Sequence, residues 1–185
     1  ARWRIFGETL DLTIGQLLDQ FGREAGFSSP SGRRIEELAH ASKDYIQLPY
    51  TVKCNDVSLS GILTAGKKML HEKKSLETLA YSIQETAFAM LAEVTERALA
   101  FAEAKELLLT GGVAANSRLQ EMLKHVCDSQ KATLYVVPLK YSGDCGAQIA
   151  WTGLLGLQAH QGVKVEESVI RQAWRIDQVD ASWRS

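Results

Sequence analysis

The stretch Leu107-Leu108-Leu109-Thr110-Gly111-Gly112-Val113-Ala114-Ala115-Asn116 places an apolar run, two glycines and a helix-forming segment in direct succession. Short apolar runs that end at a glycine turn are typical of buried strands, so we predict a strand over Glu106–Thr110. Glycine has no Cβ and lets the backbone approach a ligand closely, and the start of a helix offers free N–H groups to an anion. The stretch therefore predicts a strand-to-helix turn that faces a ligand.

The residues around this turn show helical and strand-like spacing. Before the turn, one apolar stripe predicts a long core helix over Ser75–Ala102, or two helices with a kink; its members are Leu76, Leu79, Ile83, Ala87, Met90, Leu91, Val94, Ala98 and Phe101. After the turn we expect a helix marked by Leu119 to Val126, a strand at Thr133–Val137, and a helix at Ser142–His160 with Ile149, Leu154 and Leu155 in its core. This order predicts an α/β fold that binds its ligand at the carboxyl ends of the strands.

The first third of the chain is less regular. We expect a strand at Arg2–Glu8, helices at Ile14–Ala25 and Arg33–Ala41, and a mixed or helical segment at Val57–Leu70. The segment Tyr45–Val57, which contains a proline, is expected to be irregular, and the tail from Val169 is expected to be extended.

Composition limits the function classes. The chain has 185 residues, of which 45% are hydrophobic and 23% are charged, with a formal net charge of −1. A chain of this charge does not bind nucleic acid through its overall charge, so such a role needs a local basic patch or a partner. No apolar stretch reaches the ~18 residues that a membrane span requires. The three cysteines form no C-x-x-C pair, which is typical of reduced thiols in the cytoplasm.

Six short blocks, in this order along the chain, identify it as a member of the tRNA threonylcarbamoyladenosine synthase family. This is the TsaD/Kae/Qri family, formerly called O-sialoglycoprotein endopeptidase, and the chain is most similar to the archaeal and eukaryotic branch found in KEOPS complexes. The blocks are Arg4–Asp11, Leu48–Lys53, Ser58–Leu63, Gln84–Ala89, Gly111–Asn116 and Asp144–Ala150.

The resemblance implies one ribonuclease-H-like lobe of the actin, sugar-kinase and Hsp70 (ASKHA) superfold, with connecting helices. Residues 1–185 would form this single C-terminal lobe. Residues 1–103 would supply a strand, a helical connecting region and the long core helix, and residues 104–185 the α/β part that faces the nucleotide. The family's first lobe carries an H-x-x-x-H metal motif, which none of His40, His71, His125 and His160 matches. We therefore expect the N-terminal metal-binding lobe to be absent.

The resemblance also assigns roles to individual residues. Asp19, Gly32 and Glu36 match positions that hold the ribose or adenylate part of the ligand, Gly111, Gly112 and Asn116 match nucleotide-contacting positions, and Asp144 matches a metal-binding aspartate. Each residue type also has an ordinary structural use. Asp19 and Glu36 suit solvated helix faces, Asn116 and Asp144 suit helix caps, and the two glycines suit a tight turn.

The implied reaction transfers threonylcarbamoyl from threonylcarbamoyl-adenylate to N6 of the adenosine beside the tRNA anticodon. The implied cofactors are a divalent metal (iron, zinc or magnesium) and an adenine nucleotide or threonylcarbamoyl-adenylate. The implied partners are tRNA, KEOPS-type kinase and dimerisation subunits, the missing N-terminal lobe, and a second copy through exposed apolar surface. We expect the isolated chain to be inactive or poorly active, because it lacks the histidine metal motif. Ser117, Ser142 and Cys127 have no evident base partner in the sequence, so the former endopeptidase name finds no support in these residues. Two alternatives are a non-catalytic interaction module and a sugar-kinase-like ATPase lobe.

Overall fold

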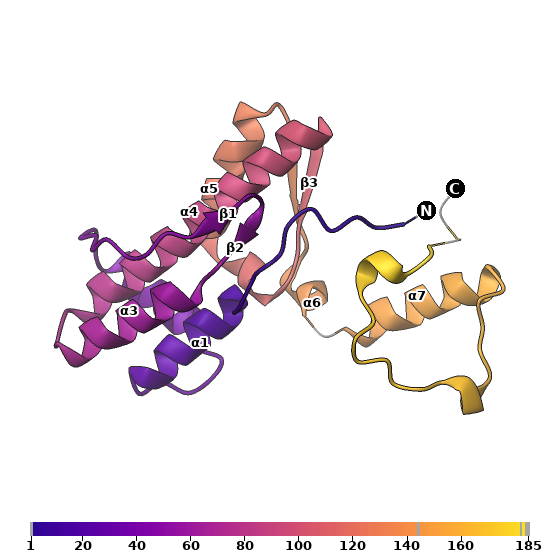
Figure 1. Ribbon diagram of the computed structural model, residues 1–185, viewed down its shortest axis with the longest axis horizontal. Helices are drawn as coiled ribbons and strands as arrows, with labels where there is room; N and C mark the ends of the chain where they lie inside the picture. Colours follow the sequence, from indigo (N-terminus) through magenta and orange to yellow (C-terminus); the bar gives the residue numbers. More distant parts are fainter. Residues whose placement is uncertain (1, 144, 182, 184–185) are drawn as a thin grey trace. The chain divides into compact units, whose positions relative to one another are not determined.

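The computed structural model describes residues 2–143, 145–181 and 183, and the chain divides into two compact units (Figure 1). The larger unit is Gly7–Ser142, and the smaller comprises Ala1–Phe6 with Gly143–Ser185. The larger unit carries every described candidate site residue. The single lobe expected over the whole chain stays a prediction.

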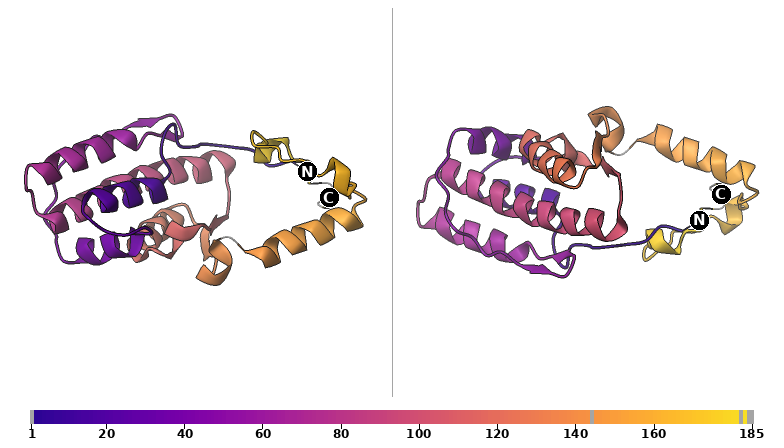
Figure 2. Two further views of the ribbon diagram at one scale, coloured as in Figure 1. Left: turned by 90° about the horizontal axis from the view of Figure 1, so that it is seen from below. Right: turned by 90° about the horizontal axis from the view of Figure 1, so that it is seen from above.

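The helices of the larger unit are centred on α4 (Leu76–Ala102), which has 27 residues. It packs against α2, α3 and α5, while α1 contacts α2 and α3 (Figure 2). The other helices are α1 (Ile14–Glu24), α2 (Gly32–His40), α3 (Ser60–His71), the 3-10 turn η1 (Gly112–Ala115), α5 (Ser117–Ser129) and α6 (Leu139–Ser142). The helix predicted from the long apolar stripe is confirmed, as are the helices predicted before and after it, with ends shifted by a few residues.

Two pairs of strands complete the larger unit. Strands β1 (Val52–Lys53) and β2 (Asp56–Val57) form a short antiparallel hairpin. Strands β3 (Glu106–Leu109) and β4 (Thr133–Val136) pair in parallel, with Leu107 opposite Leu134. Because parallel neighbours need a crossover, the chain passes from β3 through η1 and α5 to β4. The unit is therefore a mixed α/β domain, as predicted.

The core forms along the first half of α4, which is buried on more than one face. Its buried apolar residues include Leu79, Ile83, Phe88 and Met90. A helix with so broad an apolar surface is stable only when several other elements cover it. Burying each large side chain of this kind contributes about 1.5–3 kcal/mol, so the surrounding helices are held mainly by their contacts with α4.

The strand over Glu106–Thr110 forms, but the prediction that it is buried is wrong. Leu107 and Leu109 pack against the core, whereas Leu108 between them is 65% exposed. Side chains alternate between the two faces of a strand. The core covers one face of this pair of strands, and on the other face Leu108 and Tyr135 remain exposed.

Three further expectations are corrected. The predicted strand at Arg2–Glu8 is not formed, since only isolated bridges occur there, at Arg2 and at the neighbouring Thr9. Phe101 is 78% exposed at the end of α4. The helix expected at Ser142–His160 is α7 (Gly146–Gln158), and Ile149 and Leu154 are exposed rather than in a core. Among the described residues of its own unit, the other helical elements are the 3-10 turns η2 (Val165–Glu167) and η3 (Ile176–Gln178), which are too short to cover a helix face.

Asp11 fixes the start of α3. One carboxylate oxygen accepts hydrogen bonds from the N–H groups of Leu12 (2.6 Å) and Leu59 (2.8 Å). The other accepts from Ser58 Oγ (2.6 Å) and from both N and Oγ of Ser60 (3.1 and 2.6 Å). Partial desolvation raises the pKa of this carboxyl, but the hydrogen bonds from Ser58, Ser60, Leu59 and Leu12 outweigh it and hold the pKa well below its ordinary value.

We predict that Asp11→Asn lowers the free energy of unfolding by about 1 kcal/mol at neutral pH, because an NH2 group replaces one of the two oxygens that accept hydrogen bonds at this solvent-accessible position. Because folding lowers the Asp11 pKa, its contribution is present above the ordinary value of 3.8 and is lost as the pH falls below it. Urea titrations from pH 7 to pH 3 measure this. The exposed Asp44→Asn serves as the matched control, and a constant difference between Asp11→Asn and wild type at all pH values would contradict the prediction.

Candidate functional site at the start of helix α5

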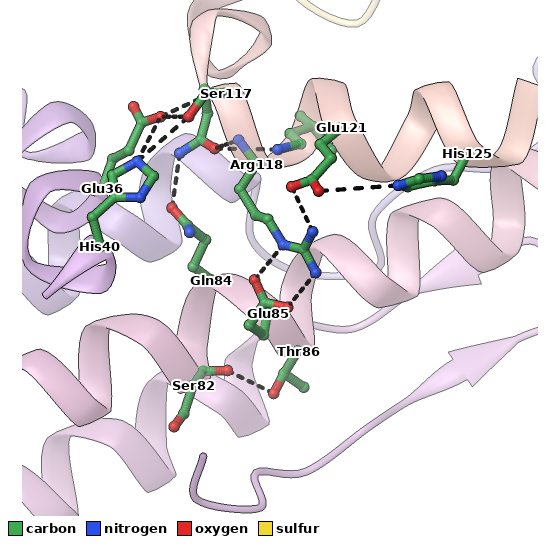
Figure 3. A network of polar contacts seen from close by, with 12 residues as sticks. Glu36, His40, Ser82, Gln84, Glu85, Thr86, Ser117, Arg118, Glu121 and His125 are labelled. Carbon is green, nitrogen blue, oxygen red and sulfur yellow. Dashed lines mark hydrogen bonds and ion pairs between the residues drawn. The ribbon is translucent and has the colours of Figure 1, made fainter. Parts of the chain in front are cut away.

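Side chains from two other helices hold the start of α5 and its cap. We call the four residues that make these contacts the α5 junction: Glu36, Gln84, Asn116 and Ser117. Glu36, on α2, accepts hydrogen bonds at Oε1 from Ser117 N (2.8 Å) and Ser117 Oγ (2.6 Å) (Figure 3). The Glu36 side chain is only 20% exposed. Glu36 is therefore partly covered, whereas the next residue, Glu37, pairs with arginines at the surface.

Asn116 caps α5 and is linked to α4. Its Oδ1 accepts from the N–H groups of Arg118 (3.0 Å) and Leu119 (3.2 Å), and its Nδ2 donates to Gln84 Oε1 (2.8 Å). Asn116 is 5% exposed and Gln84 is 2% exposed. The cap that the sequence offered as an alternative role is thus present. One Nδ2 hydrogen remains, so the side chain can still donate one hydrogen bond to a ligand.

Asp19 holds the loop that leads into α2. It accepts from Ser29 Oγ (2.8 Å) and from Ser31 N (2.6 Å), and Gly32 follows Ser31 as the first residue of α2. Ser31 is fully buried against Gly22 of α1, where an added Cβ would come within 2.4 Å of the Ser31 side chain. The loop is therefore closely packed, and Asp19 and Gly32 are parts of one structure.

The glycine pair lies between β3 and η1. Gly111 has φ of +105°, a backbone conformation that side chains with a Cβ rarely adopt, and Gly112 is the first residue of η1. No described atom lies within 4 Å of a Cβ built on either residue. The turn thus keeps its backbone open on the side where a side chain would stand.

These contacts connect six of the seven predicted site residues. Asp19 binds the residue before Gly32, Glu36 lies one helical turn beyond Gly32, and Glu36 binds Ser117, which follows Asn116. The glycine pair joins Asn116 through η1. The seventh residue, Asp144, lies outside the described residues. Among the residues described, no group of three or more His, Cys, Asp or Glu side chains could hold a metal ion.

The sequence did not predict the supporting residues. Gln84 is a buried polar residue in the middle of an apolar helix, as are Ser82 and Thr86, and that interruption was the available signal. Ser117 has polar neighbours after all. Its Oγ donates to Glu36, and His40 Nε2 lies farther away, at 3.5 Å. The hydrogen bond to the carboxylate is the shorter of the two, so Glu36 rather than His40 mainly holds the Ser117 hydroxyl.

An ion pair fixes α5 to α4 on the other side of the junction. Arg118 donates from Nε to Glu85 Oε1 (2.7 Å) and from Nη2 to Glu85 Oε2 (2.9 Å), and its Nη1 reaches Glu121 (2.6 Å) (Figure 3). The hydrogen bonds that Arg118 donates to Glu85 in particular raise the pKa of the Arg118 guanidinium above its usual range. A two-pronged arginine–carboxylate pair fixes direction as well as distance, so the start of α5 is held in a defined orientation.

We predict that Asn116→Ala lowers the free energy of unfolding by about 2–4 kcal/mol, because it removes the cap and leaves the buried Gln84 carbonyl without its donor. Asn116→Ser keeps a capping oxygen and loses only the link to Gln84, so it should cost about 1–2 kcal/mol. Urea unfolding of both variants measures the two effects. Equal losses for Ala and Ser would show that the cap contributes nothing.

Comparison with known proteins gives this geometry a family context. Residues 1–151 match the family TsaD, described as tRNA N6-adenosine threonylcarbamoyltransferase. The chain is 50% identical over 183 residues to the tRNA N6-adenosine threonylcarbamoyltransferase of Methanothrix thermoacetophila, covering 99% of this chain and 56% of that protein. The protein of the same name from Archaeoglobus fulgidus is 50% identical over 182 residues, with 98% and 56% covered.

A third relative is longer. The "Probable bifunctional tRNA threonylcarbamoyladenosine biosynthesis protein" of Methanothermobacter thermautotrophicus is 50% identical over 183 residues, which are 99% of this chain and 34% of that protein. The chain thus spans between a third and just over half the length of these curated relatives. With a family match over most of its residues and half of its positions identical to those of named members, the chain belongs to the TsaD family of tRNA N6-adenosine threonylcarbamoyltransferases.

Proposed function

We propose that this chain forms the nucleotide-binding lobe of a tRNA N6-adenosine threonylcarbamoyltransferase. The proposed reaction transfers the threonylcarbamoyl group from threonylcarbamoyl-adenylate to N6 of the adenosine beside the tRNA anticodon. The observation that carries the proposal is the continuous set of contacts from Asp19 through Glu36 to Asn116, which brings together residues that are up to 97 positions apart in the sequence.

Glu36, Asn116 and the glycine pair each have a group left for a ligand. Glu36 uses Oε1 for Ser117, and no contact within the described part of the chain engages Oε2. Asn116 keeps one Nδ2 hydrogen. Gly111 and Gly112 present backbone with no side chain in the way. We propose that the carboxylates accept the ribose hydroxyls, that Asn116 donates to the nucleotide, and that the glycine turn lies along its phosphate or base.

We assign no chemical step to a metal. The described residues do not form a metal-binding group, so they do not fit a resident ion by themselves. The divalent metal implied for the complete enzyme would take one ligand, Asp144, from this chain, and carboxylates are suitable ligands for iron, magnesium or zinc. The role we propose for the described residues is to bind and orient the adenylate.

The proposed partners follow from this reaction. They are tRNA, an N-terminal lobe that completes the nucleotide cleft, and the kinase and dimerisation subunits of a KEOPS-type complex in the cytoplasm. Self-association is proposed as well, since the outer face of β3 and β4 exposes Leu108 and Tyr135. No helix in the described part of the chain is long and apolar enough to cross a membrane.

We predict that the chain binds AMP when titrated calorimetrically, and that Asp19→Asn and Asn116→Ser each weaken binding about tenfold, since each loses one hydrogen bond involving a buried or charged group. Asp44→Asn is the matched control and should bind as wild type does. Absence of binding at millimolar AMP, with the chain shown to be folded by circular dichroism, would contradict nucleotide binding by this chain. Phosphate transfer from ATP to a sugar would favour the sugar-kinase-like alternative instead.

A further inference from the structure

We infer that Ser117 is a positioning residue that fixes one oxygen of the Glu36 carboxylate and so directs the other oxygen at the ribose hydroxyls of the bound nucleotide. In this role Ser117 determines how strongly the site discriminates ribonucleotides from nucleotides that lack those hydroxyls. The inference rests on the proposed function, because it takes Glu36 as a ligand-binding residue.

Both hydrogen bonds from Ser117 go to the same oxygen. The N–H donates over 2.8 Å and the hydroxyl over 2.6 Å, and both reach Oε1 (Figure 3). Two donors from one residue prevent the carboxylate from rotating freely about its terminal bond. The result is a carboxylate in which Oε1 is satisfied and Oε2 is available in a fixed direction.

The two sequence neighbours of Ser117 hold it in place through contacts with α4. Asn116 before it is tied to Gln84 of α4, and Arg118 after it is tied to Glu85 of the same helix. The Ser117 hydroxyl is therefore fixed relative to α4, whereas the carboxylate that it contacts belongs to α2. The Ser117–Glu36 contact links α2 to the start of α5, in addition to the direct packing of α2 on α4.

His40 is the other group close to this carboxylate, and it holds the carboxylate less strongly than Ser117 does. It lies one turn after Glu36 on α2, with Nε2 3.9 Å from Glu36 Oε1, and its side chain is 64% exposed. An exposed side chain at that distance holds the carboxylate weakly. Removing the Ser117 hydroxyl leaves Glu36 with the backbone N–H alone and lets it turn, whereas removing the His40 ring should leave its direction unchanged.

The experiment compares the affinities for AMP and for 2′,3′-dideoxy-AMP in the wild type, in four single variants and in one double variant. In the wild type, AMP should bind about tenfold more tightly than the dideoxy nucleotide, as expected for one hydrogen bond to a charged group. In Ser117→Ala the affinity for AMP should fall to near that for the dideoxy nucleotide, which itself should bind as before. Ser117→Thr keeps a hydroxyl and should retain discrimination, and His40→Ala should retain it as well. In Glu36→Gln, adding Ser117→Ala should have no further effect.

Equal weakening of both nucleotides by Ser117→Ala would overturn the inference, because that is the result of a general structural role. Unchanged discrimination in Ser117→Ala, or an additive effect in the double variant, would overturn it as well.

A second measurement tests the contact without any ligand, so that it stays decisive if the wild type fails to bind AMP and the proposed function falls. The backbone amide of residue 117 donates a hydrogen bond to Glu36. Its hydrogen should exchange with solvent several-fold faster in Ser117→Ala than in the wild type. The rate should be little changed in Ser117→Thr and His40→Ala. An unchanged exchange rate in Ser117→Ala would show that the hydroxyl does not hold the carboxylate.

Discussion

The hydrogen bonds that Asn116 and Ser117 make at the start of α5 are the constraint on which the rest of the site depends. A helix begins with N–H groups that its own turns cannot satisfy. Here Asn116 accepts two of them and Glu36, from α2, accepts a third, while Asn116 is tied to Gln84 of α4. The hydrogen bonds that satisfy the start of α5 therefore also connect three helices. Two of the residues that make them, Glu36 and Asn116, keep a carboxylate oxygen and an Nδ2 hydrogen for a ligand.

This arrangement explains why a long apolar helix contains buried polar residues. Burying Gln84 without a partner would cost about 1–3 kcal/mol, yet its carbonyl finds Asn116. Ser82 and Thr86, on the same stretch of α4, are likewise bonded, to Ile46 N and to Tyr45 Oη. Such contacts contribute little net stability compared with apolar packing, but they specify direction. Apolar burial brings the helices to α4, and the polar residues decide how the segments around it are oriented.

The sequence predicted well those features that depend on local periodicity. The long stripe before the glycine turn became α4, and the alternation of strand and helix after it became β3, α5 and β4. Predictions of burial were less successful, because burial depends on what covers an element. Leu108 belongs to an apolar run, but its face of the strand pair is left uncovered. Ile149 belongs to an apolar helix, and the other helical elements in the described part of its unit are two 3-10 turns.

In the candidate site, too, some residues could be predicted from the sequence and others depend on what the fold brings together. Asp19, Glu36 and Asn116 could be singled out because a family resemblance pointed to them, and their types suit a ribose and a base edge. The partners that fix them could not be singled out, because Gln84 lies 32 positions from Asn116 and Ser117 lies 81 positions from Glu36. Periodicity carries no information about such pairs. A serine after a capping asparagine looks like an ordinary helix start until the fold brings a carboxylate to it, and a binding residue's direction is then set by a neighbour that never needs to touch the ligand.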